Sequence, residues 1–203
     1  MLLKGQRFFF AGVLLLVTAA CSSTQNYTYE EVPSVIETPA ACHISPRSRI
    51  RLKAEGIRFI SSYNPLGRAP NVEQELLVVP EQVIHKWAEN RFVTTGNSDV
   101  QVRFIIKDAG ITGRGIVTGS CFKEIKAEYT GRFEVTIQFV DSNGLVLVEA
   151  TKAVQKSDIV ANDLTPAEQE DEWMLLTYHL VKKLSDELDK DLCSHSFNDY
   201  IER

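Results

Sequence analysis

The stretch RFEVTIQFVDSNGLVLVEATKAV, residues 132–154, decides the fold. Its first half alternates apolar and polar side chains, which predicts a strand with one buried face, made by Phe133, Val135, Ile137 and Phe139. The following Asn143-Gly144 favours a tight hairpin turn because these residues tolerate positive φ angles. Residues 145–154 should then return as the next strand. One apolar and one polar face are typical of an antiparallel sheet that helices cover on one side only.

Two segments on either side of this hairpin have helical spacing. Residues 80–92 begin with Pro80, which suits a first helical position, and place Trp87 on an apolar stripe. Residues 165–192 begin with Thr165-Pro166-Ala167-Glu168, the pattern of a capping box. Their apolar stripe includes Trp173. We expect a helix in each segment.

Two further segments alternate as strands do. Residues 49–60 form one, with a bulge expected at Gly56, and residues 99–109 form the other. The next segment, residues 110–119, is rich in glycine but lacks the lysine and hydroxyl that end a phosphate loop. It also leads into a strand and not into a helix, so no helix N-terminus would face a phosphate. We expect a flexible hairpin loop that contacts a partner.

The order strand, helix, three strands, helix predicts an α+β fold. The simplest packing is a two-layer sandwich, in which two helices cover one face of an antiparallel sheet of about four strands. The domain should occupy residues 49–193, with a polar, frayed tail at 194–203. Residues 21–48 are polar and aperiodic, which predicts a flexible tether.

The N-terminus has the pattern of an export signal. Lys4 and Arg7 precede the uncharged run Phe8–Ala20, which is too short for the roughly 20 residues of a membrane-spanning helix. Small residues then lead into Cys21. This arrangement resembles the lipobox of bacterial lipoproteins, although Thr18 stands where the family prefers Leu. The resemblance implies a signal peptide at residues 1–20 and a fatty acid on Cys21; an ordinary cleaved signal or an uncleaved anchor are the alternatives.

The net charge of the chain excludes some classes of binding partner. The chain has 22 basic and 27 acidic residues, a net charge of -5, and loss of the leader removes two of the basic ones. This balance argues against nucleic acid and against adhesion to anionic lipid through the protein surface. We expect the membrane contact to come from the lipid on Cys21.

The remaining cysteines belong to an oxidising compartment if the chain is exported. Cys42 and Cys193 flank the domain, so a disulfide between them would fasten its two ends, leaving Cys121 as a thiol. Zinc held by these two cysteines with His43 and His195 is the weaker alternative, because their spacing is too tight for an ordinary structural site. We predict no metal and no cofactor.

No catalytic arrangement stands out in the sequence. The histidines are scattered and no Gly-x-Ser-x-Gly motif is present, so we do not expect an enzyme. Trp87, Trp173 and Phe139 are expected to be core residues. In an alternative hypothesis, the helices and the sheet part to leave a groove, lined by these three side chains, for a lipid or another apolar ligand.

Several short motifs carry a further resemblance. They are Pro70-Asn71-Val72-Glu73, Trp87-Ala88-Glu89-Asn90-Arg91-Phe92, Ile106-Lys107-Asp108-Ala109 and Tyr129-Thr130-Gly131. In these the chain resembles uncharacterised envelope lipoproteins of alphaproteobacterial type, a family that brings no activity with it. The order of elements is more loosely similar to the auxiliary lipoproteins of envelope ABC transport systems. These resemblances imply a non-enzymatic accessory or assembly partner of a periplasmic or outer-membrane complex. Ser22 in place of Asp after the cysteine favours the outer membrane over the inner one.

Overall fold

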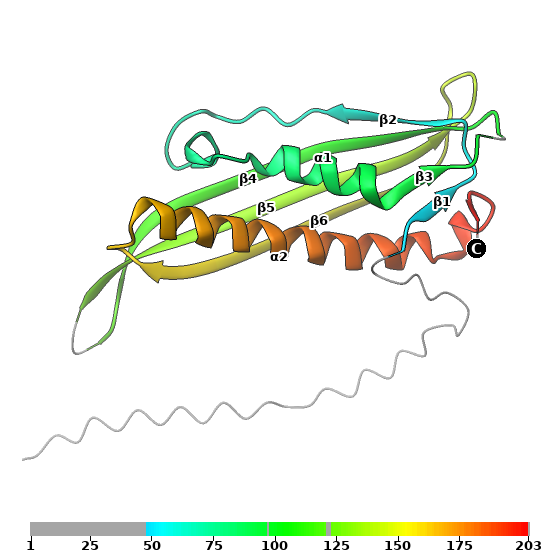
Figure 1. Ribbon diagram of the computed structural model, residues 1–203. Coiled ribbons are helices and arrows are strands. Elements are labelled where there is room, and N and C mark those ends of the chain that lie inside the picture. Colours follow the sequence, from blue (N-terminus) through cyan, green and yellow to red (C-terminus); the bar gives the residue numbers. More distant parts are fainter. Residues whose placement is uncertain (1–47, 97, 121–122, 203) are drawn as a thin grey trace, which may run out of the picture. The chain divides into compact units, whose positions relative to one another are not determined.

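The structure, a computed structural model, describes residues 48–96, 98–120 and 123–202 (Figure 1). Its main sheet contains β2 (Gly56–Ser61), β4 (Gln101–Thr118), β5 (Glu124–Val140) and β6 (Val146–Ala161), in the order β2-β4-β5-β6. A smaller sheet contains β1 (Ile50–Leu52), β3 (Phe92–Thr94) and β7 (Ile201–Glu202). The helices are α1 (Pro80–Arg91) and α2 (Pro166–Leu192), with short 3₁₀ turns η1 (Glu73–Glu75) and η2 (His195–Phe197).

The predicted α+β class is confirmed, with one correction to the sheet. β4, β5 and β6 are antiparallel neighbours, but β2 pairs with β4 in parallel, so the sheet is mixed. The parallel pairing follows from the connection, because α1 lies between β2 and β4 in the chain and returns it to the same end of the sheet. Figure 1 shows both helices on the same face of this sheet.

A bulge keeps the apolar side chains of β4 on the helix-covered face. Val102, Phe104 and Ile106 are buried, and beyond the register shift at Ile106/Asp108 the buried positions become Ala109 and Ile111. The apolar residues lie at even positions up to Ile106 and at odd positions from Ala109 onward. The extra residue at the bulge, Lys107, keeps both sets on the same face of the sheet. The shift therefore extends one buried stripe along most of the strand.

Close contact between α2 and β5 depends on a glycine. A Cβ atom on Gly131 would lie 2.3 Å from Cδ1 of Leu180, a fully buried residue of α2. Helix α1 packs on the other half of the sheet through Trp87, whose ring centroid lies 6.1 Å from that of Phe104. Phe92, the first residue of β3, contacts the same ring at 5.9 Å. Helix α2 thus approaches the sheet closely over a glycine, whereas α1 packs on it through an aromatic side chain.

The small sheet corrects two expectations at the ends of the domain. The predicted strand at 49–60 is two strands in two sheets, because the chain turns at 53–55, between β1 and β2. The predicted polar tail at 194–203 is also wrong for the described part: β7 pairs with β1, and Phe197 and Ile201 are buried. These two apolar side chains complete the core beneath the end of the sheet.

The glycine-rich segment is another correction, because most of it is strand. β4 continues to Thr118 and pairs with β5 as far as Glu124. Gly113 fits this strand because a Cβ there would lie 2.8 Å from the ring of Tyr129. The loop that joins the strands is shorter than expected and begins at Gly119, whose φ is 89°.

The local turn and cap signals are confirmed. The turn after β5 is closed by the Gly144 N–H, which donates to the Asp141 carbonyl, and Gly144 has a φ of 84°. At α2, Thr165 and Glu168 form the predicted capping box. Within the described part of the chain, no helix combines the length and apolarity needed to cross a membrane.

Candidate functional site

The predicted signal peptide and the predicted lipidation site lie outside the described residues. Three of the four cysteines lie outside the described residues, namely Cys21, Cys42 and Cys121. The lipidation of Cys21 and the disulfide partner of Cys42 therefore stay predictions. Cys193 follows the last residue of α2 and takes part in a disulfide. The chain enters the described part beside this end of α2, where Arg91 donates to the Ser48 carbonyl and pairs with Asp189 at 2.6 Å.

The three residues of the predicted groove belong to three separate aromatic groups. Trp87 contacts Phe92 and Phe104, whereas Trp173 contacts Tyr129 edge-on at 5.4 Å between ring centroids. Phe139 is fully buried against Phe197 and Tyr200. Since these contacts do not connect the three groups, the positions of Trp87, Trp173 and Phe139 give the apolar groove no support.

The described histidines do not come together. The His85 ring is tilted against that of Phe59 and lies 3.7 Å from Glu89, whereas His195 contacts Asn198 in the turn after α2. His179 lies beside Tyr178 on α2. Among the described residues, no group of three histidine, cysteine or acidic side chains is placed to hold a metal ion.

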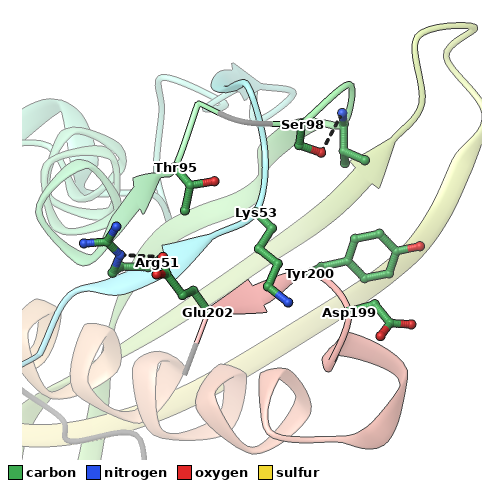
Figure 2. Close-up of a pocket in the computed structure, with 8 residues that line it drawn as sticks. Arg51, Lys53, Thr95, Ser98, Asp199, Tyr200 and Glu202 are labelled. Atoms are coloured by element: carbon green, nitrogen blue, oxygen red, sulfur yellow. Dashed lines mark hydrogen bonds and ion pairs between the residues drawn. The ribbon is translucent and has the colours of Figure 1, made fainter.

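One hollow, of about 490 Å³, lies at the small sheet (Figure 2). Its walls include Arg51, Lys53, Ser98, Asp199, Tyr200 and Glu202. Arg51 pairs with Glu202 at 2.6 Å, and Figure 2 shows Lys53 between this pair and Asp199. Its cationic and anionic groups balance and both residues of the ion pair are largely exposed, so the hollow selects neither sign of ligand charge.

A second hollow, about 350 Å³, lies on the face of the main sheet that the helices leave uncovered. We name it the open-face hollow; its walls include Tyr63, Asn64, Asn71, Asp108, Arg132 and Gln155. Beneath it, the buried Glu73 carboxylate accepts hydrogen bonds from the Tyr63 hydroxyl, the Asn71 amide and the Ile111 N–H. Burial, and then the bond to Glu73, raises the pKa of the Tyr63 phenol well above its usual value, so the phenol keeps its proton.

Nothing in the sequence indicates the buried carboxylate beneath this hollow. Glu73 stands in a polar stretch, Asn71-Val72-Glu73, where a carboxylate ordinarily faces solvent. Only 4% of Glu73 is exposed. Its burial follows from a long-range contact, because the segment before α1 runs beside the edge of β4, where the Val72 N–H donates to the Ile111 carbonyl.

Several exposed apolar side chains lie on the elements that meet at the end of the domain where α2 begins. We name this surface the apolar end and define it by Leu77, Val117, Ile125, Ile159, Leu175 and Tyr178, which are 48 to 87% exposed. Ile159 and Leu175 also line a third hollow of about 350 Å³ together with Glu172. α2 has 27 residues and is about 40 Å long; Leu175 lies about 25 Å, and Tyr178 about 21 Å, from the helix end near which the chain enters at Ser48.

The apolar end also carries unpaired negative charge. Glu170, Asp171 and Glu172 lie in the first turns of α2, and within the described residues none of them forms an ion pair with a basic side chain. Glu170 instead accepts the N–H of Leu77 at 3.1 Å. An apolar surface with an acidic border suits a protein with a basic border better than an anionic bilayer.

Comparison with known proteins finds likenesses among solved structures only. No protein-family model and no curated protein matches the sequence. A minor lipoprotein from Acinetobacter baumannii is similar at 13% identity and a TM-score of 0.34, over 72% of this chain and 95% of that one. An uncharacterised lipoprotein B from Nitrosomonas europaea is similar at 11% identity and a TM-score of 0.40, over 74% and 90% of the two chains. The rare lipoprotein B from Shewanella oneidensis is similar at 11% identity and a TM-score of 0.36, over 70% of this chain and 97% of that one. Likenesses this distant carry no inference about function.

Proposed function

We propose that this protein is a lipid-anchored component of a bacterial cell envelope that acts, without enzymatic activity, as an accessory or assembly partner of a larger complex. The fatty acid on Cys21 would hold it on the periplasmic side of a membrane, the outer membrane by preference. Its resemblance to lipoproteins of alphaproteobacterial type, noted from the motifs above, agrees with this setting.

One observation carries the partner role, namely the position of the apolar end. Ile159 and Leu175 line one hollow at this end, and apolar surface that stays exposed beside a hollow is typical of an interaction site. Leu175 and Tyr178 lie on a rigid helix whose buried face is already satisfied by the core. Because the tether joins the domain at the opposite end of α2, the apolar end can face away from the lipid and toward another protein.

The test is site-specific photocrosslinking in intact cells. A photoreactive amino acid at Leu175 should give a discrete light-dependent adduct with an envelope protein. The same amino acid at Glu149, exposed on β6 away from the apolar end, should not. Recovery of the Leu175 variant as a lone monomer from gently solubilised membranes, with no adduct, would refute the partner role.

The anchor is tested separately. Mass spectrometry of the membrane-extracted protein should find a mature chain that begins at Cys21 with acyl chains attached. A single acyl chain holds a protein only marginally, so stable membrane association requires more than one chain. An unmodified sulfur on Cys21 in the membrane-bound protein would contradict the anchor without bearing on the crosslinking result.

A further inference from the structure

We propose that the open-face hollow binds a small neutral saccharide. The proposal goes beyond the partner role, since the hollow lies on the uncovered face of the sheet and shares no defining residue with the apolar end. It rests on how the walls are fixed, which polar groups remain available, and which ligand charges the walls exclude.

The walls of the hollow are held in place before any ligand arrives. One oxygen of Glu73 accepts from the Tyr63 hydroxyl at 2.7 Å, from the Asn71 amide at 2.9 Å and from the Ile111 N–H at 2.7 Å. These bonds tie the loop between β2 and α1 to β4. A binding site whose polar groups are already positioned loses less entropy when it takes up a ligand.

Several polar groups at the hollow remain available. Among the described residues, the side-chain amides of Asn64 and Gln155 form no hydrogen bond, and each offers two N–H donors and one acceptor oxygen. Asn71 donates to Glu73, which leaves its own oxygen free to accept. The hollow thus presents donors and acceptors from opposite walls, as neighbouring hydroxyl groups on one ligand require.

The charges around the hollow exclude the main alternatives. Arg132 already pairs with Glu134 at 2.9 Å and lies 3.5 Å from Asp108, so a phosphate would meet more negative than positive charge. A cation would have to displace the Arg132 guanidinium from Asp108 and Glu134, and an apolar ligand would bury the unpaired amides at a cost. A neutral ligand rich in hydroxyl groups avoids all three penalties.

On the β4 side of the hollow, the geometry also disfavours a peptide added as a strand. The edge of β4 beside the hollow is already occupied, because the Gly113 N–H donates to the Pro70 carbonyl and Asn71 forms a bridge with Thr112. An extended peptide needs such an edge to be free. The hollow, at about 350 Å³, falls within the size range of small-molecule sites.

The experiment is a titration of the lipidated full chain in a detergent without sugar headgroups, followed by NMR. Maltose, lactose and chitobiose serve as neutral probes, with glucose 6-phosphate and an uncharged tripeptide amide as contrasts. We expect saturable binding of at least one neutral sugar. Asn64→Ala and Gln155→Ala should each weaken it about 2- to 10-fold, the effect of one hydrogen bond.

The control is Gln138→Ala, which removes an amide from the same face of β5, outside the hollow, and should leave binding unchanged. Absence of saturable binding for every neutral sugar would overturn the proposal. It would also be overturned if the phosphate or the tripeptide bound more tightly than the sugars, or if both hollow variants bound as the wild type does.

Discussion

Replacing Gly131 by alanine should destabilise the protein through one contact. The new Cβ would lie 2.3 Å from Cδ1 of Leu180 and 3.6 Å from side-chain atoms of Ile111 and Leu176. Carbon atoms in contact normally sit about 3.5–4.0 Å apart, so the overlap with Leu180 exceeds 1 Å by this measure. Leu180 is fully buried in the core.

The expected magnitude follows from two opposing effects. Overpacking a close-packed core costs about 1–3 kcal/mol. Replacing glycine within a strand returns about 0.5–1 kcal/mol, because alanine loses less backbone entropy on folding. Gly115→Ala is the matched control, since Gly115 lies in β4 and no neighbouring atom comes within 4 Å of its Cβ position. We therefore expect Gly131→Ala to be about 1–3 kcal/mol less stable than Gly115→Ala.

Urea unfolding followed by circular dichroism measures both free energies. A double-mutant cycle isolates the contact, because in a Leu180→Ala background the added methyl group of Gly131→Ala would enter vacated space. The penalty should then disappear or reverse. If Gly131→Ala is as stable as Gly115→Ala, or equally harmful with and without Leu180, the close approach of α2 to β5 is not what the glycine provides.

Three further predictions concern single side chains. Arg91→Met should lower the free energy of unfolding by about 3–5 kcal/mol, because it leaves the largely buried Asp189 without its partner. Arg51→Met, at an exposed ion pair, should lower it by under about 1 kcal/mol. Equal losses of stability in urea unfolding would contradict this. Thr165→Ala should cost about 1 kcal/mol by removing the cap of α2, and Thr165→Ser should largely restore it, as thermal unfolding would show. The pKa of Asp141 is lowered in the folded protein, chiefly because its carboxylate accepts the Leu145 N–H. The carboxylate therefore stabilises the folded state above about pH 4, and this stabilisation is lost as the pH falls through the folded-state pKa. Asp141→Asn should flatten this acid dependence in unfolding series from pH 5 downward, and an unchanged slope would exclude the role.

Local signals in the sequence were sufficient for the elements with local causes. The alternation at Phe133 to Phe139, the Asn143-Gly144 turn and the capping box at Thr165 all depend on residues close together in the chain, and the structure contains each. The prediction of a loop at Gly113 was wrong because the role of this glycine depends on a residue far away in the chain. Glycine commonly marks a loop, but here it fits a strand that passes under the ring of Tyr129, a residue on the neighbouring strand.

The candidate sites were less accessible to sequence reasoning. The open-face hollow joins Tyr63 and Asn71 in one loop to Arg132 and Gln155 on two strands, and no periodicity relates these positions. Glu73 gave no sign that its carboxylate would be buried. The apolar end was hidden because Leu175 and Tyr178 follow Trp173 closely on a helix that was expected to bury most of its large apolar side chains.

The pairing of β1 with β7 has a consequence for the order in which the protein can mature. Arg51 and Glu202 are separated by 151 positions in the chain, yet they face each other in the small sheet. If the chain is exported N-terminus first, as the proposed anchor requires, β1 emerges long before its second neighbour, β7, has crossed the membrane. Until then, one edge of β1 stays open to other strands, and a periplasmic chaperone that shields this edge would find its substrate only during secretion.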